Sequence, residues 1–343
     1  MKAMQLQHLA QLEQDPHPLK LVNLPVPIPG ENEILLRVSA CAVCHTELDE
    51  IEGRLPPPRL PVIPGHQVVG HVAGKGRNVR ACKEGERLGV AWIFSACGIC
   101  HPCQSGCENL CADFRGTGRD VDGGYAEYMI ARQEFTFSIP GTFTDVEAAP
   151  LLCAGAIGYR ALQLANLQDG QPLGLTGFGS SGHLVLKLAR HTHPNSPMLV
   201  FARSEKERSF ARQLGAAWTG DTLDQPPYEL NAIIDTTPAW RPVVEALKHL
   251  SSGGRLVVNA IRKEAGDRQA LLDLDYPTHL WMEKEIKSVA NVTRTDVRAF
   301  LELAAEIPIR PAYETLPLEN ANRALVELKR GDIQGARILV LDQ

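Results

Sequence analysis

Apolar and polar residues follow two different rhythms along this chain. Up to about residue 150, short β-prone apolar runs such as 34–38 are separated by glycine or proline every few residues, which predicts an irregular β-rich domain with long loops. Farther along, short apolar runs alternate with segments long enough for helices. The four strand candidates there are 173–177, 198–202, 231–237 and 253–260. This alternation predicts a parallel, doubly wound sheet.

The C-terminal part of the chain returns to mixed character. Helical periodicity at 297–307 and 319–331 precedes an apolar run at 336–342, which predicts two helices and a closing strand. A chain of 343 residues is long enough for two domains. We therefore expect an α/β protein with one domain formed by residues 1–150 and 293–343. Residues 151–292 are expected to form the parallel-sheet domain.

Composition narrows the class of protein. With 44% hydrophobic and 22% charged residues, the chain resembles an ordinary soluble globular protein, and no apolar run approaches the ~20 residues that span a bilayer. A net charge of −5 without a basic run argues against a nucleic-acid partner. The N-terminal stretch lacks the pattern of a secretory signal, so we expect a cytoplasmic protein without a membrane partner. Its nine cysteines, in tight clusters, favour metal-bound thiolates over disulfides.

Four cysteines form a compact motif, C-x2-C-x2-C-x7-C, within a loop rich in glycine, proline and serine. They are Cys97, Cys100, Cys103 and Cys111. Such a loop buries too little apolar surface to order itself, whereas four thiolates around Zn²⁺ supply folding energy and leave no open position. The motif therefore predicts a structural zinc site. An iron–sulfur cluster is the alternative, but its usual cysteine spacings differ. Cys107 is a spare cysteine inside the motif.

Three other potential ligands lie far apart, in CAVCHT, IPGHQ and PLLCAG. They are Cys44, His66 and Cys153. Taken singly, each is more simply interpreted as a satisfied histidine or a small core residue. Together, two thiolates and an imidazole with a free fourth position are typical of a catalytic zinc site.

The series CHTELD, PGHQVVG, the four-cysteine motif, DGGYAEY, PLLCAG and GFGSSG extends in that order over nearly the whole chain. This ordered series resembles the zinc-dependent medium-chain alcohol dehydrogenase family. The resemblance implies a GroES-like β-barrel catalytic domain and a Rossmann nucleotide-binding domain. It also implies a catalytic zinc on Cys44, His66 and Cys153, and a structural zinc on the four clustered cysteines. The expected reaction is reversible hydride transfer between an alcohol and NAD(P), giving an aldehyde or ketone.

The same resemblance implies roles for residues around the first zinc ligand. Thr46 matches the position that accepts the substrate proton, and His45 matches the position that approaches the cofactor pyrophosphate. Thr46 is also suited to capping a short helix. The chain departs from the family at Asp49, where many relatives have a relay histidine, so the relay beyond Thr46 is open. Gln67 replaces a common glutamate, and Glu47 stands where an aspartate usually orients the metal ligands.

A glycine-rich turn follows the strand candidate at 173–177. In GFGSSG, Gly177, Gly179 and Gly182 permit a tight turn and close approach of a pyrophosphate to the start of the next helix. The motif alone is weak evidence. Its position between a strand and a helix makes it a strong prediction of a dinucleotide site.

The end of the next strand candidate decides which dinucleotide is expected. An NAD enzyme usually offers an acidic side chain there, but this chain has Arg203, Ser204 and Lys206. These side chains favour a 2′-phosphate and hence NADP(H) over NAD(H). The alternative is that Ser204 and Glu207 only cap a helix. Arg337 is one residue out of register with the Gly-Arg pair of relatives, so we assign it no cofactor role.

Several expectations remain less specific. Trp92 and Phe94 are candidate walls of a substrate pocket, with the protein core as the alternative. The resemblance implies a homodimer or homotetramer, with 285–293 as an edge strand that pairs across subunits. Two rival functions remain: a zinc-free quinone or enoyl reductase on the same fold, and a non-catalytic zinc-binding interaction protein.

Overall fold

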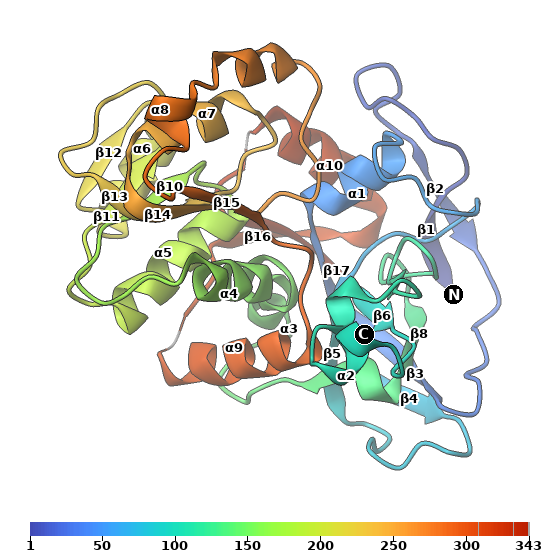
Figure 1. The fold of residues 1–343 in the computed structure, drawn as a ribbon. Helices are drawn as coiled ribbons and strands as arrows, with labels where there is room; N and C mark the ends of the chain where they lie inside the picture. The colour runs from blue at the N-terminus through green and yellow to red at the C-terminus, as the bar shows by residue number, and fades with distance from the viewer. Residues whose placement is uncertain (308, 332, 342–343) are drawn as a thin grey trace. The chain divides into compact units, whose positions relative to one another are not determined.

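The computed structural model describes residues 1–307, 309–331 and 333–341. The chain divides into two compact units, which differ in colour in Figure 1 because they use different parts of the chain. The first unit contains Met1–Ala156 and the segment from Asn291 onward, and the second contains Ile157–Ala290. Within the described residues, every helix is too short or too polar to cross a bilayer.

The first unit is built on a mainly antiparallel sheet of seven strands. In spatial order these are β16 (Tyr313–Pro317), β17 (Ala336–Val340), β3 (Glu33–Val43), β4 (Gln67–Lys75), β5 (Arg87–Val90) and β9 (Thr136–Ser138), with β8 (Tyr128–Arg132) also paired to β3. Smaller two-stranded sheets join β1 (Lys2–Leu6) to β2 (Leu19–Asn23) and β6 (Ile93–Ser95) to β7 (Arg115–Gly116). The predicted strands at 34–38 and near the C-terminus are confirmed.

Strand β3 is the central element of this unit. Its pairing with β4 shifts register twice, between Leu35 and Leu36 and between Val38 and Ala40. Such irregularities bend a strand and increase its twist. Residues 41–43 at its end are buried, and the chain then turns directly into α1 (His45–Ile51). Residue 44, which is only partly exposed, therefore lies directly beside the buried end of this strand.

The first unit also contains several helices. They are α1, α2 (His101–Gln104), α3 (Asp145–Ala148), α9 (Arg294–Glu306) and α10 (Ala321–Arg330). The two predicted C-terminal helices are confirmed as α9 and α10. Helix α9 begins three residues before the predicted 297 because Thr293 caps it and exchanges hydrogen bonds with Asp296. Helix α10 ends where Gly331 adopts φ +73°, a left-handed conformation that glycine accepts without strain.

The second unit contains a parallel sheet of six strands. Their spatial order is β12 (Trp218–Gly220), β11 (Met198–Phe201), β10 (Leu173–Thr176), β13 (Leu230–Asp235), β14 (Leu250–Val258) and β15 (Glu285–Ser288). All neighbouring pairs are parallel. The strand order reverses between β10 and β13, which is the switch point where doubly wound sheets bind ligands. The predicted fold class and its four strand candidates are confirmed.

Helices follow the strands of this sheet. They are α5 (Ser180–Thr192), α6 (Glu205–Gln213), α7 (Arg241–Lys248) and α8 (Tyr276–His279), and α4 (Ala154–Ala165) precedes the first strand. Helices α4 and α5 pack closely, because a Cβ on Gly158 would lie 2.7 Å from the Val185 side chain. Short 3₁₀ turns complete the chain: η1 (Glu108–Leu110), η2 (Gln133–Phe135), η3 (Ala149–Leu152), η4 (Arg268–Asp273) and η5 (Leu318–Asn320). Strands β10 and β11 are buried along their whole length, as expected between helical layers.

Candidate metal and cofactor sites

Three ligands that are distant in sequence converge in the first unit. The ligand atoms of Cys44, His66 and Cys153 all lie within 4.8 Å of one another. His66 Nε2 is 3.3 Å from Cys153 Sγ. Two sulfurs and an imidazole nitrogen form a donor set that suits Zn²⁺, and three protein ligands leave a position for another oxygen.

Local backbone geometry directs each ligand to this point. Cys44 is the extended residue between β3 and α1, and Cys153 follows η3 directly. His66 follows Gly65, which has φ +101°. A Cβ at Gly65 would lie 2.4 Å from the Tyr125 ring, so only glycine fits both the backbone conformation and the space there.

One carboxylate positions two of the three ligands. Glu47 Oε1 lies 2.6 Å from His66 Nδ1, and Glu47 Oε2 accepts a hydrogen bond of 2.7 Å from the Cys44 backbone N–H. Both His66 and Glu47 have side chains that are at most 1% exposed. A hydrogen bond at Nδ1 leaves Nε2 as the ligand atom and fixes the orientation of the ring. The expected orienting role thus has a clear geometric basis at Glu47.

The ionisable groups of this site perturb one another. A hydrogen bond with Cys153 lowers the pKa of the Cys44 thiol well below its ordinary value, and the same interaction raises the pKa of Cys153. Burial is the largest single influence on the pKa of His66 and would lower it, but the charges and hydrogen bonds of Glu47 and Cys44 together outweigh burial and raise that pKa. The protein therefore stabilises a thiolate at Cys44, the form that binds metal.

Sequence reasoning missed a second buried carboxylate beside the site. Glu50 is 1% exposed, and within the described part of the chain neither of its oxygens has a hydrogen-bond partner at bonding distance. Burial, and then the charge of Glu47, raise the pKa of Glu50 well above its ordinary range. The Gln67 side-chain oxygen is likewise buried and without a partner there. The spacing of Glu47 and Glu50, one helical turn apart, was the available signal.

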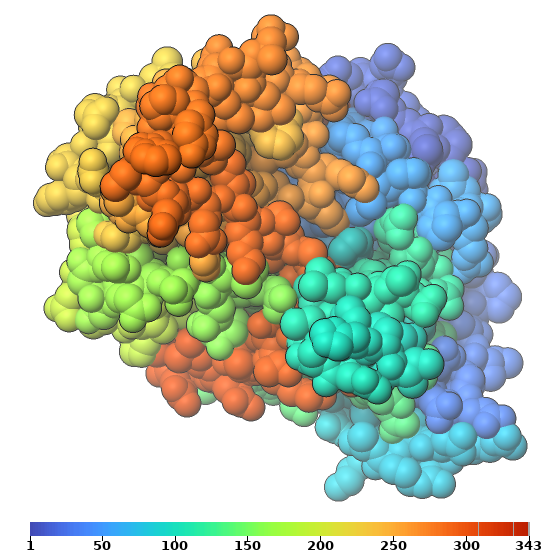
Figure 2. All heavy atoms as spheres, viewed as in Figure 1, coloured from blue at the N-terminus to red at the C-terminus, as the bar shows by residue number. Residues whose placement is uncertain are grey.

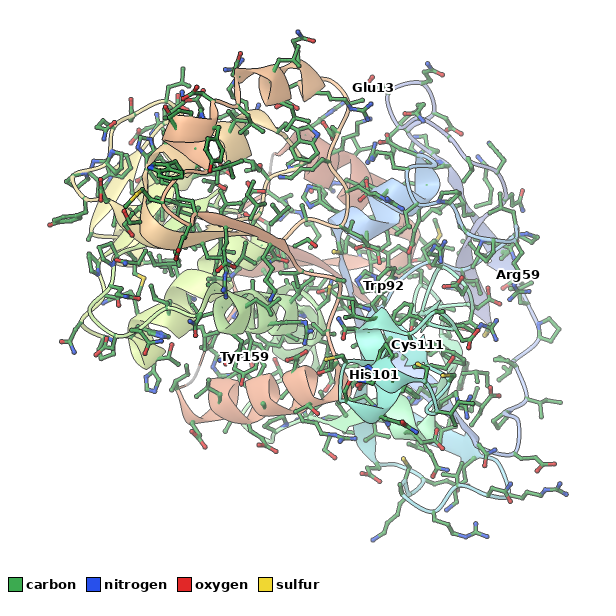
Figure 3. The ribbon with its side chains drawn as sticks, viewed as in Figure 1. Glu13, Arg59, Trp92, His101, Cys111 and Tyr159 are labelled. Atoms are coloured by element: carbon green, nitrogen blue, oxygen red, sulfur yellow. The ribbon has the colours of Figure 1, made fainter. Side chains whose placement is uncertain are left out.

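Trp92 lies against the candidate ligands. Its ring centroid is 6.4 Å from that of His66 in an edge-on arrangement, and 5.3 Å from that of Phe114; Trp92 is labelled in Figure 3. Its predicted place in the wall of a substrate pocket, with the protein core as the alternative, stays a prediction. Phe94 lies in β6 and is 6% exposed, which agrees with the alternative of a core residue.

The candidate proton-transfer residues lie on α1. Thr46 is buried, and its hydroxyl oxygen is 3.6 Å from Cys44 Sγ. Asp49, one turn farther on, forms an ion pair with the Arg54 guanidinium. Burial raises the pKa of Asp49 although Arg54 opposes the shift. His45 is exposed at the start of α1, and its cofactor role stays a prediction.

The four cysteines of the C-x2-C-x2-C-x7-C motif also converge. The sulfurs of Cys97, Cys100, Cys103 and Cys111 lie within 4.8 Å of one another. Backbone N–H groups of Cys97 and Cys100 approach sulfurs of the cluster at 3.4 Å. Hydrogen bonds from the N–H groups of Ile99 and Cys100 lower the pKa of Cys97 to about 6. Cys107 is outside the cluster, as predicted for a spare thiol.

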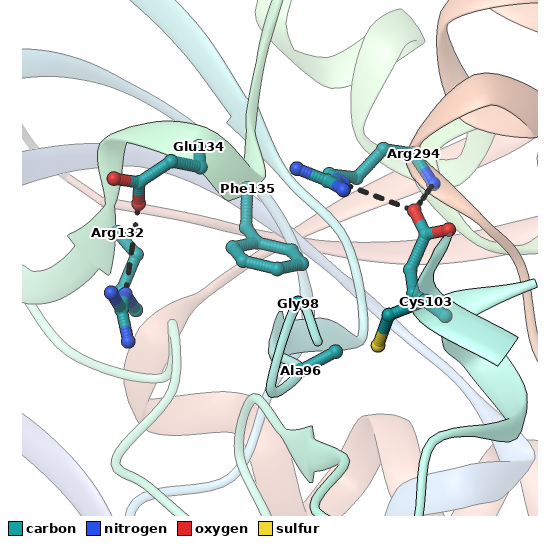
Figure 4. A pocket seen from close by; sticks show the side chains of 8 residues that line it. Ala96, Gly98, Cys103, Arg132, Glu134, Phe135 and Arg294 are labelled. Atoms are coloured by element: carbon teal, nitrogen blue, oxygen red, sulfur yellow. Dashed lines mark hydrogen bonds and ion pairs between the residues drawn. The ribbon is translucent and has the colours of Figure 1, made fainter. Parts of the chain in front are cut away.

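This cysteine loop lies at the surface of the first unit, where residues near 100 are teal in Figure 2. Ile99 at its tip is 80% exposed. The loop is anchored by Glu108, which accepts hydrogen bonds from the Arg294 backbone N–H and guanidinium at 2.9 and 3.0 Å, drawn as dashed lines in Figure 4. Arg294 also stacks over Phe135 at 4.8 Å. The hollow in Figure 4 is lined by these anchoring residues and Cys103. We therefore interpret it as part of the packing that holds the cysteine loop in place.

The glycine-rich turn has the expected setting between β10 and α5. Gly177 has φ +79°, and a Cβ there would lie 2.9 Å from Thr236 Oγ1. A Cβ on Gly182 would lie 2.8 Å from the Gly177 carbonyl oxygen. A Cβ on Gly179, by contrast, would meet no atom within 4 Å. The first and third glycines are thus required by the fold, whereas Gly179 leaves open space at the start of a helix, where a pyrophosphate fits.

The residues after β11 are accessible. Arg203, Ser204 and Lys206 are all exposed, and Ser204 caps α6 by accepting a hydrogen bond of 3.1 Å from the Glu207 backbone N–H. Ser204 therefore caps the helix, as the alternative to a cofactor role predicted. Glu205 is occupied by ion pairs with arginines inside α6, which reduces the negative charge that it presents near Arg203.

Comparison with known proteins gives consistent matches. Residues 30–141 match the family model of the alcohol dehydrogenase GroES-like domain. A probable alcohol dehydrogenase of Mycobacterium tuberculosis is 42% identical over 95% of this chain and 94% of its own. An alcohol dehydrogenase of Geobacillus stearothermophilus is 33% identical over 91% and 93% of the two chains. The structure of a cinnamyl alcohol dehydrogenase from Sorghum bicolor superposes with a TM-score of 0.86 at 26% identity, covering 99% and 97% of the chains.

Proposed function

The chain belongs to the zinc-dependent medium-chain alcohol dehydrogenase family, and from that premise we propose that Cys44, His66 and Cys153 hold its catalytic zinc ion. The convergence of these three distant ligands supports the proposal. The chain is an oxidoreductase that transfers a hydride between an alcohol and a nicotinamide cofactor. A zinc ion held by these three residues would supply Lewis-acid chemistry at the substrate oxygen, and a nicotinamide cofactor would supply the hydride chemistry.

The protein's own groups prepare this reaction. Glu47 orients His66 and also holds the Cys44 backbone, so the ligand atoms are positioned before substrate binds. Thr46 carries a buried hydroxyl beside Cys44, and a hydroxyl can accept one proton while it donates another. We assign Thr46 the first proton-transfer step from the substrate hydroxyl. Asp49, held by Arg54 on the same helix, is assigned the next position.

A cysteine substitution tests the assignment of the catalytic zinc. Cys153→Ser should lower the zinc content, measured by elemental analysis, from two ions per chain to one and remove alcohol dehydrogenase activity. The matched control is Cys107→Ser, which changes a thiol outside both clusters and should keep both ions. Two zinc ions in Cys153→Ser would overturn the assignment.

The same measurements separate the rival functions. Activity that persists after the zinc is removed from the wild-type protein would indicate a zinc-free reductase. One zinc per chain without binding of a nicotinamide nucleotide would indicate an interaction protein. A panel of alcohols and aldehydes with NADPH and NADH then identifies the substrate class and the favoured cofactor.

The proposed structural zinc site uses the four clustered cysteines. Their sulfurs already lie close together, and N–H groups point to the cluster. All four positions of a tetrahedron would be filled by protein, so this ion would stabilise the loop and bind no substrate. Serine substitution of Cys103 should therefore increase proteolysis of the loop while the zinc at the other site is retained.

We favour NADP(H) as the cofactor. No acidic residue directly follows β11, where Arg203, Ser204 and Lys206 are exposed. Because Glu205 is engaged by Arg208 and Arg212, the positive charge of Arg203 is less opposed. An arginine is well suited to hold a phosphate through parallel N–H bonds.

A homo-oligomer is proposed through the edge strand β15. All four residues of this strand are exposed at the end of the six-stranded sheet, and Ile286 on it is 47% exposed. An exposed strand edge can pair with a second copy. Ile286→Lys should shift the protein toward the monomer in analytical ultracentrifugation. A cytoplasmic location is also proposed, because thiols that are to bind metal need an environment that does not oxidise them to disulfides.

A further inference from the structure

The second unit contains a buried amide whose function is unexplained. Asn259 directly follows β14, and its backbone N–H donates a hydrogen bond of 2.7 Å to the Asp235 carbonyl oxygen at the end of β13. The Asn259 side chain is 7% exposed. Among the residues that the structure describes, neither its Oδ1 nor its Nδ2 has a hydrogen-bond partner. A buried amide that leaves both its donor and its acceptor unpaired lowers the stability of the fold.

The neighbouring polar side chains, in contrast, form a closed network. Asp235 accepts hydrogen bonds from Thr176 Oγ1 at 2.6 Å and from Thr237 Oγ1 at 2.7 Å, and it forms a buried ion pair with Lys263. Lys263 also donates to the Thr237 carbonyl oxygen at 2.7 Å. These groups satisfy one another's hydrogen-bonding capacity at this edge of the sheet. None of these interactions involves the Asn259 side chain, which is therefore available to a ligand.

The sheet topology indicates which part of a bound dinucleotide would lie next to Asn259. A doubly wound sheet binds a dinucleotide across its switch point, with one mononucleotide half on each side, and here the switch lies between β10 and β13. The glycine-rich turn follows β10, and Arg203 follows β11 on one side of the switch. Asn259 follows β14 on the other side. The half of the dinucleotide that carries the nicotinamide therefore belongs on the side of Asn259.

We propose that the Asn259 side chain recognises the carboxamide of the nicotinamide ring. A primary carboxamide offers one carbonyl acceptor and two N–H donors, and the asparagine side chain offers the same set. The two amides can therefore pair, with Nδ2 donating to the ligand carbonyl and Oδ1 accepting from the ligand N–H. This inference rests on the proposed function, because it needs a nicotinamide dinucleotide on this sheet.

Equilibrium binding tests the proposal without any measurement of activity. Isothermal titration calorimetry would compare NADP⁺, its 3-acetylpyridine analogue, in which a methyl replaces the amide nitrogen, and 2′-phospho-ADP-ribose, which has no nicotinamide. Asn259→Ala should weaken NADP⁺ binding by about 10-fold, which corresponds to ~1.4 kcal/mol. It should leave the affinity for 2′-phospho-ADP-ribose within about twofold.

Discrimination between the cofactor and its analogue provides the specific readout. The wild-type protein should bind NADP⁺ more tightly than the acetylpyridine analogue, and Asn259→Ala should bind the two about equally. Asn259→Asp, which keeps the size but loses the N–H donor, should weaken NADP⁺ binding as well. Asn231→Ala, at the opposite end of the neighbouring strand β13, is the matched control and should change none of these affinities.

Two outcomes would overturn the inference. Equal losses for NADP⁺ and 2′-phospho-ADP-ribose in both Asn259 variants would indicate a general structural effect, and unchanged discrimination against the analogue would exclude carboxamide recognition. If the wild-type protein bound none of the three ligands, nor NAD⁺ and ADP-ribose, the proposed function itself would fail. These measurements thus distinguish a failure of carboxamide recognition by Asn259 from a failure of the proposed cofactor site as a whole.

Discussion

Glu47 offers the sharpest test of how the proposed catalytic zinc site is built. Its two carboxylate oxygens lie 2.6 Å from His66 Nδ1 and 2.7 Å from the Cys44 backbone nitrogen. In Glu47→Gln the amide oxygen can accept only one of these two hydrogen bonds well, because the NH₂ group cannot accept the other. The substitution also removes the negative charge that increases the basicity of His66 as a ligand.

The expected cost follows from these contacts. Loss of a partner that orients metal ligands typically lowers metal affinity 10- to 100-fold, or by about 1.4–2.7 kcal/mol. A buried hydrogen bond to a charged group contributes about 1.5–3 kcal/mol, so the two estimates agree. We therefore expect Glu47→Gln to weaken one zinc site by one to two orders of magnitude and to leave the other unchanged.

Competition with a chromophoric zinc chelator measures this effect. The two zinc ions per chain should be released in separate steps as the chelator concentration rises. In Glu47→Gln only one of these steps should shift to a lower chelator concentration. The matched control is Glu52→Gln, since Glu52 is a buried carboxylate at the end of the same helix but pairs with Arg54 and Lys329. Identical curves for Glu47→Gln and wild type would refute the reasoning, and equal weakening of both ions would indicate general destabilisation.

Three further predictions concern the second unit. Gly179→Ala should keep the melting temperature but weaken dinucleotide binding at least 10-fold, whereas Gly182→Ala should lower the melting temperature because its Cβ would meet backbone. Arg203→Ala should weaken NADPH binding about 10-fold and NADH binding little, and equal losses for both would argue against a 2′-phosphate site. Burial lowers the pKa of His183 to about 4, so the unfolded chain binds more protons below pH 6.5 and stability should fall by about 3 kcal/mol between pH 6.5 and 4. His183→Gln should flatten this pH dependence in denaturant titrations, while His17→Gln, on an exposed residue, should not.

The fold was predictable where local pattern and burial agree. Strands such as β10 and β13 are short apolar runs that are buried in the sheet, so their sequence pattern directly reports their environment. Strand β15 was expected to extend over 285–293 but covers only Glu285–Ser288. Its residues are exposed, so no buried face imposes a periodicity by which its end could be predicted.

The candidate site was predictable only in part, for a related reason. The spacing of the four clustered cysteines predicts a metal site because metal chemistry restricts which residues can serve. Cys44 and His66, in contrast, lie too far apart for any spacing rule and were joined only by the resemblance to a known family. The environment of Glu50 and Asn259 depends instead on chain segments far away in sequence, and no local pattern reports whether a polar side chain will find a partner.

Charge balance gives a second argument for a cation at the proposed catalytic site, independent of ligand geometry. Glu47 and Glu50 are buried and interact electrostatically with the thiol of Cys44, and His66 beside them can carry positive charge. A buried charge without a partner costs several kcal/mol, and the raised pKa values of Glu50 and Cys153 reflect how poorly the protein alone stabilises their charged forms. The Gln67 oxygen adds another unpaired acceptor. A divalent cation would favour the charged forms of these groups, so it would stabilise the folded chain there as well as serve the reaction.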